Sequence, residues 1–195
     1  MSQPVLDAVF GGLGYADRIL AGVSAPARHQ LTPCEGLDVE ALAAHLVQKV
    51  LIFGGVGGGA TNDPDAFPLP DLERVAPIDA YRPAAARVRT AWSGTTLART
   101  FDLPQGQLLG ADLCHFFLLE VLGHGWDLAV ATGQPADAGE VLADAGLAAA
   151  AAIGDEVLRS PGLMGPAVPV AADSPPMDRF VAAIGRDPVA WVSRA

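Results

Sequence analysis

The chain has 195 residues, of which 51% are apolar and 17% are charged, and its net charge is −10 because 22 acidic residues outnumber 12 basic ones. This composition is typical of one folded domain and argues against a disordered chain. The acidic balance, with no basic cluster, argues against binding to a phosphate backbone. We therefore expect no nucleic-acid partner, which also argues against a protein that repairs DNA by contacting it directly.

The N-terminal segment lacks the basic start and the clean apolar run of a signal peptide. No segment has the roughly 20 uninterrupted apolar residues that a membrane span needs. Two cysteines, Cys34 and Cys114, do not make a disulfide framework. The sequence therefore predicts a cytoplasmic protein with no membrane partner.

The first half of the chain predicts two helices. Apolar residues recur at helical spacing over 4–22. After a polar loop, Asp38 is the predicted N-cap of a helix over 39–53, with Glu40 in its first turn. We expect this helix to end in the glycine-rich run 54–60, which would form a flexible segment after it. It does not resemble a nucleotide-binding loop, because it follows a helix and no Lys-Ser or Lys-Thr comes after it.

The middle of the chain predicts a third helix and an extended segment. The helix covers 80–93, with Asp79 as its cap and Pro83 in its first turn, where a missing N–H costs little. In residues 94–110 apolar and polar residues then alternate as in a β-strand, and we interpret this stretch as an extended segment that forms a short hairpin.

The second half predicts two long helices and one short one. The fourth helix covers about 110–131 and ends at Gly133, a typical glycine C-cap. An alanine-rich fifth helix covers about 137–158. A Pro-rich loop over 160–176 leads to a last short helix, which begins at Met177.

These elements predict an all-α fold, because long amphipathic helices without convincing strands bury their apolar faces against one another. We expect a four-helix bundle forming a single domain over 1–195. Its core covers about 4–158, and its C-terminal extension, 159–195, is Pro-rich and carries one small helix. The high alanine content is compatible with a homodimer.

Three residues predict a metal site. Glu120 and His124 are four residues apart in the fourth helix, so their side chains lie on one face and can chelate one ion. His45, from a facing helix, would complete a set of two nitrogens and one oxygen. This set suits zinc first, with nickel or ferrous iron as alternatives, and leaves positions open for water or substrate. The ordinary alternative is an ion pair between Glu120 and His124, with His45 an unrelated histidine.

The surroundings of Glu120 favour the metal. Its helix is apolar on most sides, and a buried carboxylate without a partner costs several kcal/mol. It therefore needs a cation, a hydrogen-bond network or a raised pKa. Gly123 and Gly125 flank His124, and each costs about 0.5–1 kcal/mol relative to alanine in a helix interior. We expect them to clear space for a ligand or for a neighbouring helix.

Other polar residues of the fourth helix are expected to have different roles. Asp127 follows His124 on a similar face, where it either orients the imidazole or is an exposed polar residue. His115 is nine residues before His124 and points to the opposite face. Cys114 and Trp126 are predicted core residues. A Ser–His–Asp hydrolase is not favoured, because no G-x-S-x-G motif is present.

Three segments resemble one known family: 32-TPCEGLDVEALAAHLV-47, 115-HFFLLEVLGHGWDLAVATGQ-134 and 164-MGPAVPVAADSPPMDRFVAAIGRDP-188. They are similar to actinobacterial DinB-like proteins, which are related to the N-terminal domain of mycothiol-dependent maleylpyruvate isomerase. The resemblance implies a DinB-like four-helix bundle with a divalent metal at one end. Carried over to this sequence, it implies His45, Glu120 and His124 as the ligands.

The resemblance also implies a reaction class. A DinB-like relative of the isomerase would be a thiol-dependent transferase or isomerase in which the metal activates a thiol or a water. Mycothiol would be the thiol cosubstrate, and an electrophilic small molecule would be its partner. The alternative is a non-catalytic bundle that binds a small ligand or a partner protein and holds a structural metal or none.

Overall fold

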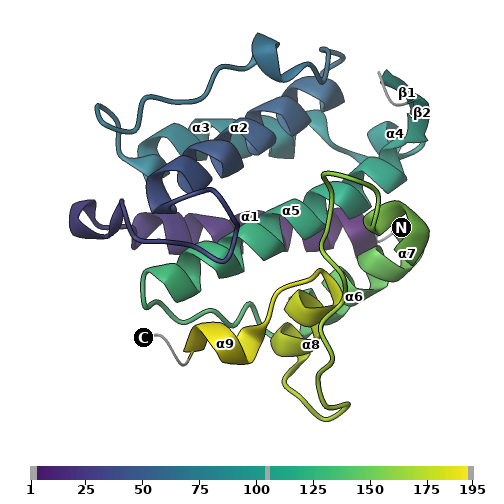
Figure 1. Ribbon diagram of the computed structural model, residues 1–195. Helices are drawn as coiled ribbons and strands as arrows, with labels where there is room; N and C mark the ends of the chain where they lie inside the picture. The colour runs from purple at the N-terminus through teal and green to yellow at the C-terminus, as the bar shows by residue number, and fades with distance from the viewer. Residues whose placement is uncertain (1–3, 104–105, 193–195) are drawn as a thin grey trace.

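The computed structural model describes residues 4–103 and 106–192, and most of these residues are helical (Figure 1). The long helices are α1 (Pro4–Ala21), α2 (Val39–Gly57), α3 (Pro77–Ala91), α5 (Gly110–Ala131) and α6 (Glu140–Ile153). The short helices are η1 (Ala25–Ala27), η2 (Pro64–Ala66), α4 (Gly94–Leu97), α7 (Asp155–Leu158), α8 (Pro176–Ala183) and α9 (Pro188–Val192). Two short strands, β1 (Thr100–Leu103) and β2 (Gly106–Leu109), lie between α4 and α5.

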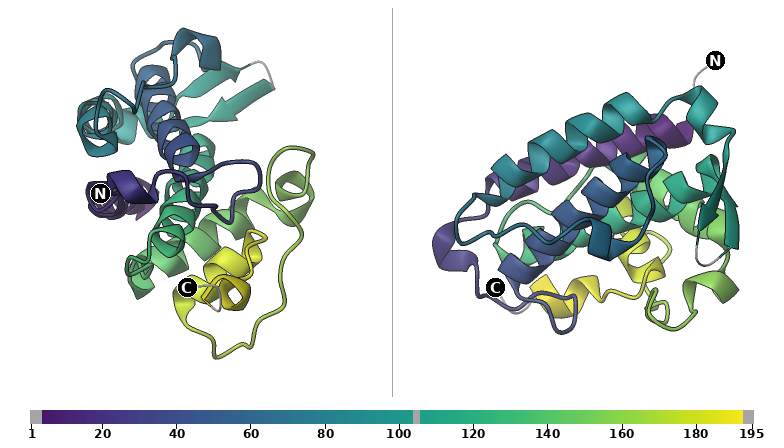
Figure 2. Two further views of the ribbon diagram at one scale, coloured as in Figure 1. Left: turned by 60° about the vertical axis from the view of Figure 1, so that its left-hand side comes forward. Right: turned by 90° about the horizontal axis from the view of Figure 1, so that it is seen from above.

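Four helices form the bundle. Helix α1 packs against α5, α5 against α2, α2 against α3, and α3 against α1, which closes a ring that can be followed in the left view of Figure 2. Leucines from these helices fill its centre and are fully buried: Leu13, Leu42, Leu46, Leu118 and Leu122. Helix α6 packs outside the ring against α5 and α1, and α8 packs on α6. The prediction of an all-α bundle is confirmed, with α6 and α8 as a further layer.

Helix α2 begins as predicted but ends later. The side chain of Asp38 accepts a hydrogen bond from a first-turn backbone N–H at 2.9 Å. The glycine run ends the helix as predicted, but α2 continues past the predicted last residue, 53, to Gly57. A Cβ at Gly57 would lie 2.5 Å from the indole nitrogen of Trp92, and one at Gly55 would collide with the ring of Phe67. The glycines therefore allow close packing against α2.

Helix α3 begins earlier than predicted. Its first residue is Pro77, whose fixed φ and missing N–H suit the first helical position. Asp79 lies in the first turn and is not the cap, so that prediction is wrong. Pro83 is consequently inside the helix, where it removes one backbone hydrogen bond.

The predicted hairpin is confirmed in part. Strands β1 and β2 pair antiparallel, with Thr100 opposite Leu109 and Leu103 opposite Gly106. Residues 94–97, predicted to be extended, form the helical turn α4 instead, because the Ser93 side chain caps it by accepting from the N–H of Thr96. Residues 104–105 of the predicted hairpin lie outside the described residues.

The second half of the chain follows the prediction with one break. Helix α5 has the predicted bounds, and Gly133 follows it with a φ of 67°. The predicted single helix over 137–158 is wrong, because Gly154 has a φ of 85° and separates α6 from α7. Helix α8 matches the predicted short helix, and α9 was not predicted.

Helices α2 and α5 are long and apolar enough, by length and composition alone, to cross a membrane. In the folded protein 61% of the apolar window of α2 and 72% of that of α5 are buried. A helix surrounded by other helices on most sides has this composition. Their apolar character is therefore accounted for by their place in the bundle.

Candidate metal centre

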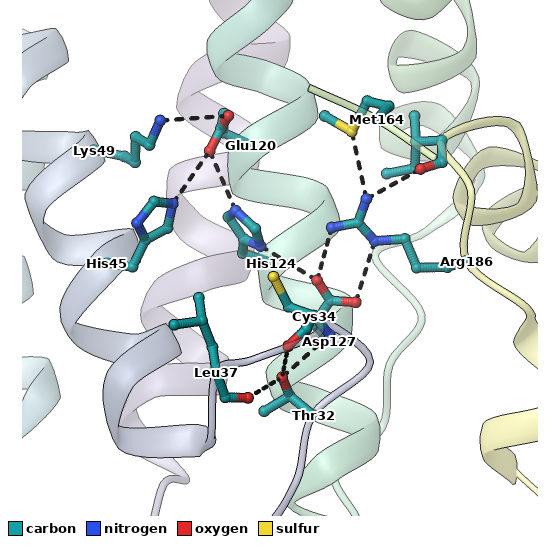
Figure 3. A network of polar contacts seen from close by, with 11 residues as sticks. Thr32, Cys34, Leu37, His45, Lys49, Glu120, His124, Asp127, Met164 and Arg186 are labelled. Atoms are coloured by element: carbon teal, nitrogen blue, oxygen red, sulfur yellow. Dashed lines mark hydrogen bonds and ion pairs between the residues drawn. The ribbon is translucent and has the colours of Figure 1, made fainter. Parts of the chain in front are cut away.

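The three predicted ligand residues meet between α2 and α5 (Figure 3). His45 comes from α2, and Glu120 and His124 come from successive turns of α5. One ligand-type atom from each lies within 4.8 Å of the others. Oε2 of Glu120 is 3.2 Å from Nε2 of His124 and 3.8 Å from Nε2 of His45. The planes of the two imidazoles stand at 85° to each other, and both rings present Nε2 to the same carboxylate oxygen.

The carboxylate of Glu120 is the electrostatic centre of this cluster. Oε2 is buried, and neither imidazole contact gives it a hydrogen bond of good geometry. Oε1 lies 3.7 Å from Nζ of Lys49. Burial raises the pKa of Glu120, but the imidazoles of His124 and His45 outweigh burial and hold the pKa well below its ordinary value. Glu120 is therefore ionised, and its buried Oε2 lacks a hydrogen bond.

His124 is held from its other side by Asp127. Nδ1 of His124 donates to Oδ2 of Asp127 over 3.2 Å, and Asp127 is fully buried, so it is not an exposed polar residue. Burial lowers the pKa of His124, but Asp127, Cys34 and Glu120 outweigh burial and raise it well above its ordinary value. The hydrogen bond at Nδ1 leaves Nε2 directed at Glu120, which is the orientation that a ligating histidine needs.

The donor set fits a divalent cation. Two imidazole nitrogens and one carboxylate oxygen converge, and the buried oxygen among them lacks a hydrogen bond. This combination suits zinc, nickel or ferrous iron. With no ion bound, the arrangement is a buried carboxylate paired with protonated His124 and with Lys49, which is the ordinary ion pair considered from the sequence.

Three further residues belong to the site and were missed in the sequence. Cys34 forms a second group of potential ligands with His124 and Asp127. Lys49 follows His45 by four residues on α2, so helical spacing could have identified it. Arg186 is brought in from the C-terminal extension, and no spacing rule points to it.

The C-terminal extension closes the site. Arg186 donates two hydrogen bonds to Asp127, at 2.9 and 3.3 Å, and a third to the carbonyl of Ile184. Burial lowers the pKa of Arg186, but Asp127 outweighs burial and raises it. A pocket of about 610 Å³ results, lined by the three candidate ligands together with Cys34, Lys49 and Arg186 among others.

Other residues of α5 that were singled out in the sequence have structural roles. Among the described residues, His115 belongs to neither group of potential ligands. Cys114 and Trp126 are buried core residues, as predicted, and burial raises the pKa of the Cys114 thiol to about 12. A Cβ at Gly125 would lie 2.5 Å from the ring of Tyr15, and one at Gly123 would lie 2.9 Å from Ile184. Both glycines make room for packed neighbours.

Comparison with known sequences identifies relatives over most of the chain. Residues 13–129 match the family described as the mycothiol maleylpyruvate isomerase N-terminal domain. Two proteins of Mycobacterium tuberculosis, "Uncharacterized protein MT0763" of strain CDC 1551 and "Uncharacterized protein Rv0738" of strain H37Rv, are each 34% identical over 172 residues. Each match covers 86% of this chain and 90% of the relative.

Comparison with solved structures identifies the same fold. The crystal structure of the mycothiol-dependent maleylpyruvate isomerase matches with a TM-score of 0.60 at 20% identity. The match covers 96% of this chain and 85% of that one. It therefore extends beyond the bundle into the C-terminal extension.

Proposed function

The chain belongs to the DinB-like family of the mycothiol maleylpyruvate isomerase N-terminal domain, and on that basis we propose that it is a metal- and thiol-dependent transferase or isomerase. In this proposal His45, Glu120 and His124 bind a divalent ion, with zinc as the first choice and nickel or ferrous iron as alternatives. Mycothiol is the proposed cosubstrate, because the matching family and the structurally similar isomerase are both named for it.

The observation that carries the proposal is the unsatisfied oxygen of Glu120. A buried carboxylate oxygen without a hydrogen bond is costly, and metal coordination removes this cost. Nε2 of His45 and Nε2 of His124 both face this oxygen. A cation held by these three atoms would compensate Glu120 and replace the proton on His124.

A divalent ion bound there would lower the pKa of a thiol or water. The protein's own residues prepare the site for that chemistry. Asp127 holds Nδ1 of His124 and so keeps Nε2 in place. Arg186 fixes Asp127 and forms one wall of the pocket. Lys49 adds a positive charge beside Glu120, which favours an anionic cosubstrate.

The proposal includes the partners and the location expected from the sequence. The partners are a small thiol and an electrophilic small molecule. Nucleic acid and membrane are not among them, and the net charge of −10 supports the exclusion of nucleic acid. A cytoplasmic location and a homodimer complete the proposal.

The test is a reaction that needs protein, metal and thiol together. The protein is loaded separately with zinc, nickel or ferrous iron and incubated with mycothiol and a panel of electrophiles, including unsaturated acids and ketones. Loss of free thiol and isomerisation of each electrophile are both measured. We expect turnover with one of the metals, loss of turnover in Glu120→Gln, and no change in Glu73→Gln, which alters an exposed carboxylate.

The outcome also decides between catalysis and binding alone. Turnover that survives Glu120→Gln would contradict the proposed role of the site. No turnover with any metal or electrophile would contradict the proposed activity and favour a non-catalytic bundle that binds a small ligand.

A further inference from the structure

A second pocket, of about 440 Å³, has mostly apolar walls. Its walls come from α2, the β1–β2 hairpin and α5, and they include Ile52, Phe53, Leu103, Leu108, Leu113 and Phe116. Five of these side chains are only partly buried: Ile52, Leu103, Leu108, Leu113 and Phe116. Partly exposed apolar side chains gathered around one hollow are typical of a small-molecule site, and the volume is in the usual range for one.

This apolar pocket adjoins the metal centre. Lys49, Glu120 and Leu163 line both pockets. Val157 and Leu163 add two large apolar side chains that are 44% and 48% exposed. A molecule in the apolar pocket would therefore have one end beside Glu120 and would share that point with a molecule in the polar pocket.

Lys49 brings an ammonium group to the shared point, beside the carboxylate of Glu120. It is the only cationic residue among the described residues that line the apolar pocket, and it is the only lysine in the chain. Its side chain is 37% exposed, with Nζ 3.7 Å from Oε1 of Glu120. An ammonium has three N–H donors, and this one is partly exposed, so it can bind the anionic group of a ligand while it also pairs with Glu120.

We propose that the second substrate of this protein is an amphipathic carboxylic acid. Its apolar chain or ring occupies the apolar pocket, and its carboxylate lies beside Lys49, next to the metal centre. Its role as a substrate rests on the proposed function, whereas its binding depends only on the apolar pocket and Lys49.

The first test measures binding of decanoate, and of decanol as its uncharged counterpart, by titration calorimetry on metal-free and zinc-loaded protein. Leu108→Asp places a carboxylate in the pocket wall and is expected to weaken decanoate binding by at least about tenfold. Leu109→Asp is the matched control, because neighbouring strand residues point to opposite faces and Leu109 does not line the pocket. Lys49→Gln is expected to weaken decanoate but not decanol.

The second test uses the unmodified protein and so does not depend on a variant that folds. Acetic anhydride modifies Lys49, and mass spectrometry of the peptide that contains this single lysine measures the extent. Decanoate is expected to slow the acetylation of Lys49, and decanol is expected to slow it less.

The outcomes separate this inference from the proposed function. Decanoate that binds all variants equally, or that leaves Lys49 as reactive as before, overturns the inference. If the thiol-dependent reaction is nevertheless found, the proposed function stands alone. If decanoate binds as expected and no thiol reaction is found with any metal, the ligand assignment stands and the proposed function fails.

Discussion

Arg186 donates two hydrogen bonds to the fully buried carboxylate of Asp127, although the two residues are 59 positions apart in the chain. Asp127 in turn holds His124, so the C-terminal extension is connected to the candidate metal centre through one carboxylate. The extension is therefore part of the site.

Replacing Arg186 is expected to destabilise the protein strongly. Arg186→Met removes both guanidinium hydrogen bonds to the buried carboxylate of Asp127 and leaves it with His124, and breaking a buried pair in this way costs roughly 3–5 kcal/mol. Denaturant unfolding followed by circular dichroism measures the free energy of unfolding. Arg82→Met is the control, because Arg82 pairs with Asp17 at the exposed surface and should matter much less. If the two variants lose the same free energy of unfolding, the buried pair contributes no more to stability than the exposed one.

Two glycine substitutions are expected to have opposite effects. Gly125→Ala places a methyl group against the ring of Tyr15 and should destabilise the protein by about 1–3 kcal/mol. Gly14→Ala, in α1, meets no neighbouring atom and should stabilise it by about 0.5–1 kcal/mol. Thermal unfolding of both variants measures the difference. If Gly125→Ala unfolds at the same temperature as the unmodified protein, α1 and α5 are not packed this closely.

The two cysteines are expected to react at very different rates. Cys34 is partly exposed in the wall of the 610 Å³ pocket, whereas Cys114 is fully buried with its pKa raised to about 12. Iodoacetamide at neutral pH should therefore modify Cys34 in the folded protein and leave Cys114 unmodified until denaturant is added. Peptide mass spectrometry locates the label, with Cys34→Ser as the control. Early labelling of Cys114 would contradict its position in the core.

Zinc binding is expected to strengthen as pH rises. The raised pKa of His124 means that the metal-free site binds a proton there at and above pH 6.5, and zinc must displace it. For one displaced proton the affinity should rise by about tenfold per pH unit until the raised pKa is passed. Calorimetry in buffers of different ionisation enthalpy measures both the affinity and the proton release. An affinity that does not change between pH 6 and pH 8 would mean that His124 is not a ligand.

Helical spacing predicted the bundle and the three residues of the candidate site. Glu120 and His124 belong to one helix, and His45 belongs to another with a clear Asp38 cap, so local patterns were sufficient to identify them. The structure brings these side chains together. Their role as metal ligands remains a proposal.

The errors arose where tertiary contacts override local preference. The glycines at the end of α2 have the composition of a loop but remain helical, because Trp92 and Phe67 pack where side chains would be. Gly154 breaks the predicted fifth helix because its backbone takes a positive φ, which composition does not reveal. Arg186 could not be assigned to the site, because its partner Asp127 lies on another element.

The most direct test of the central claim is the metal content of four purified proteins, prepared without a histidine tag: the unmodified chain, His45→Gln, His124→Gln and His115→Gln. The last variant is the matched control, because His115 lies on the same helix as His124 but outside the cluster. Mass spectrometry of bound metals should find about one ion per chain in the unmodified protein and in His115→Gln, and much less in the other two. The same trace amount of metal in all four proteins would contradict the metal centre.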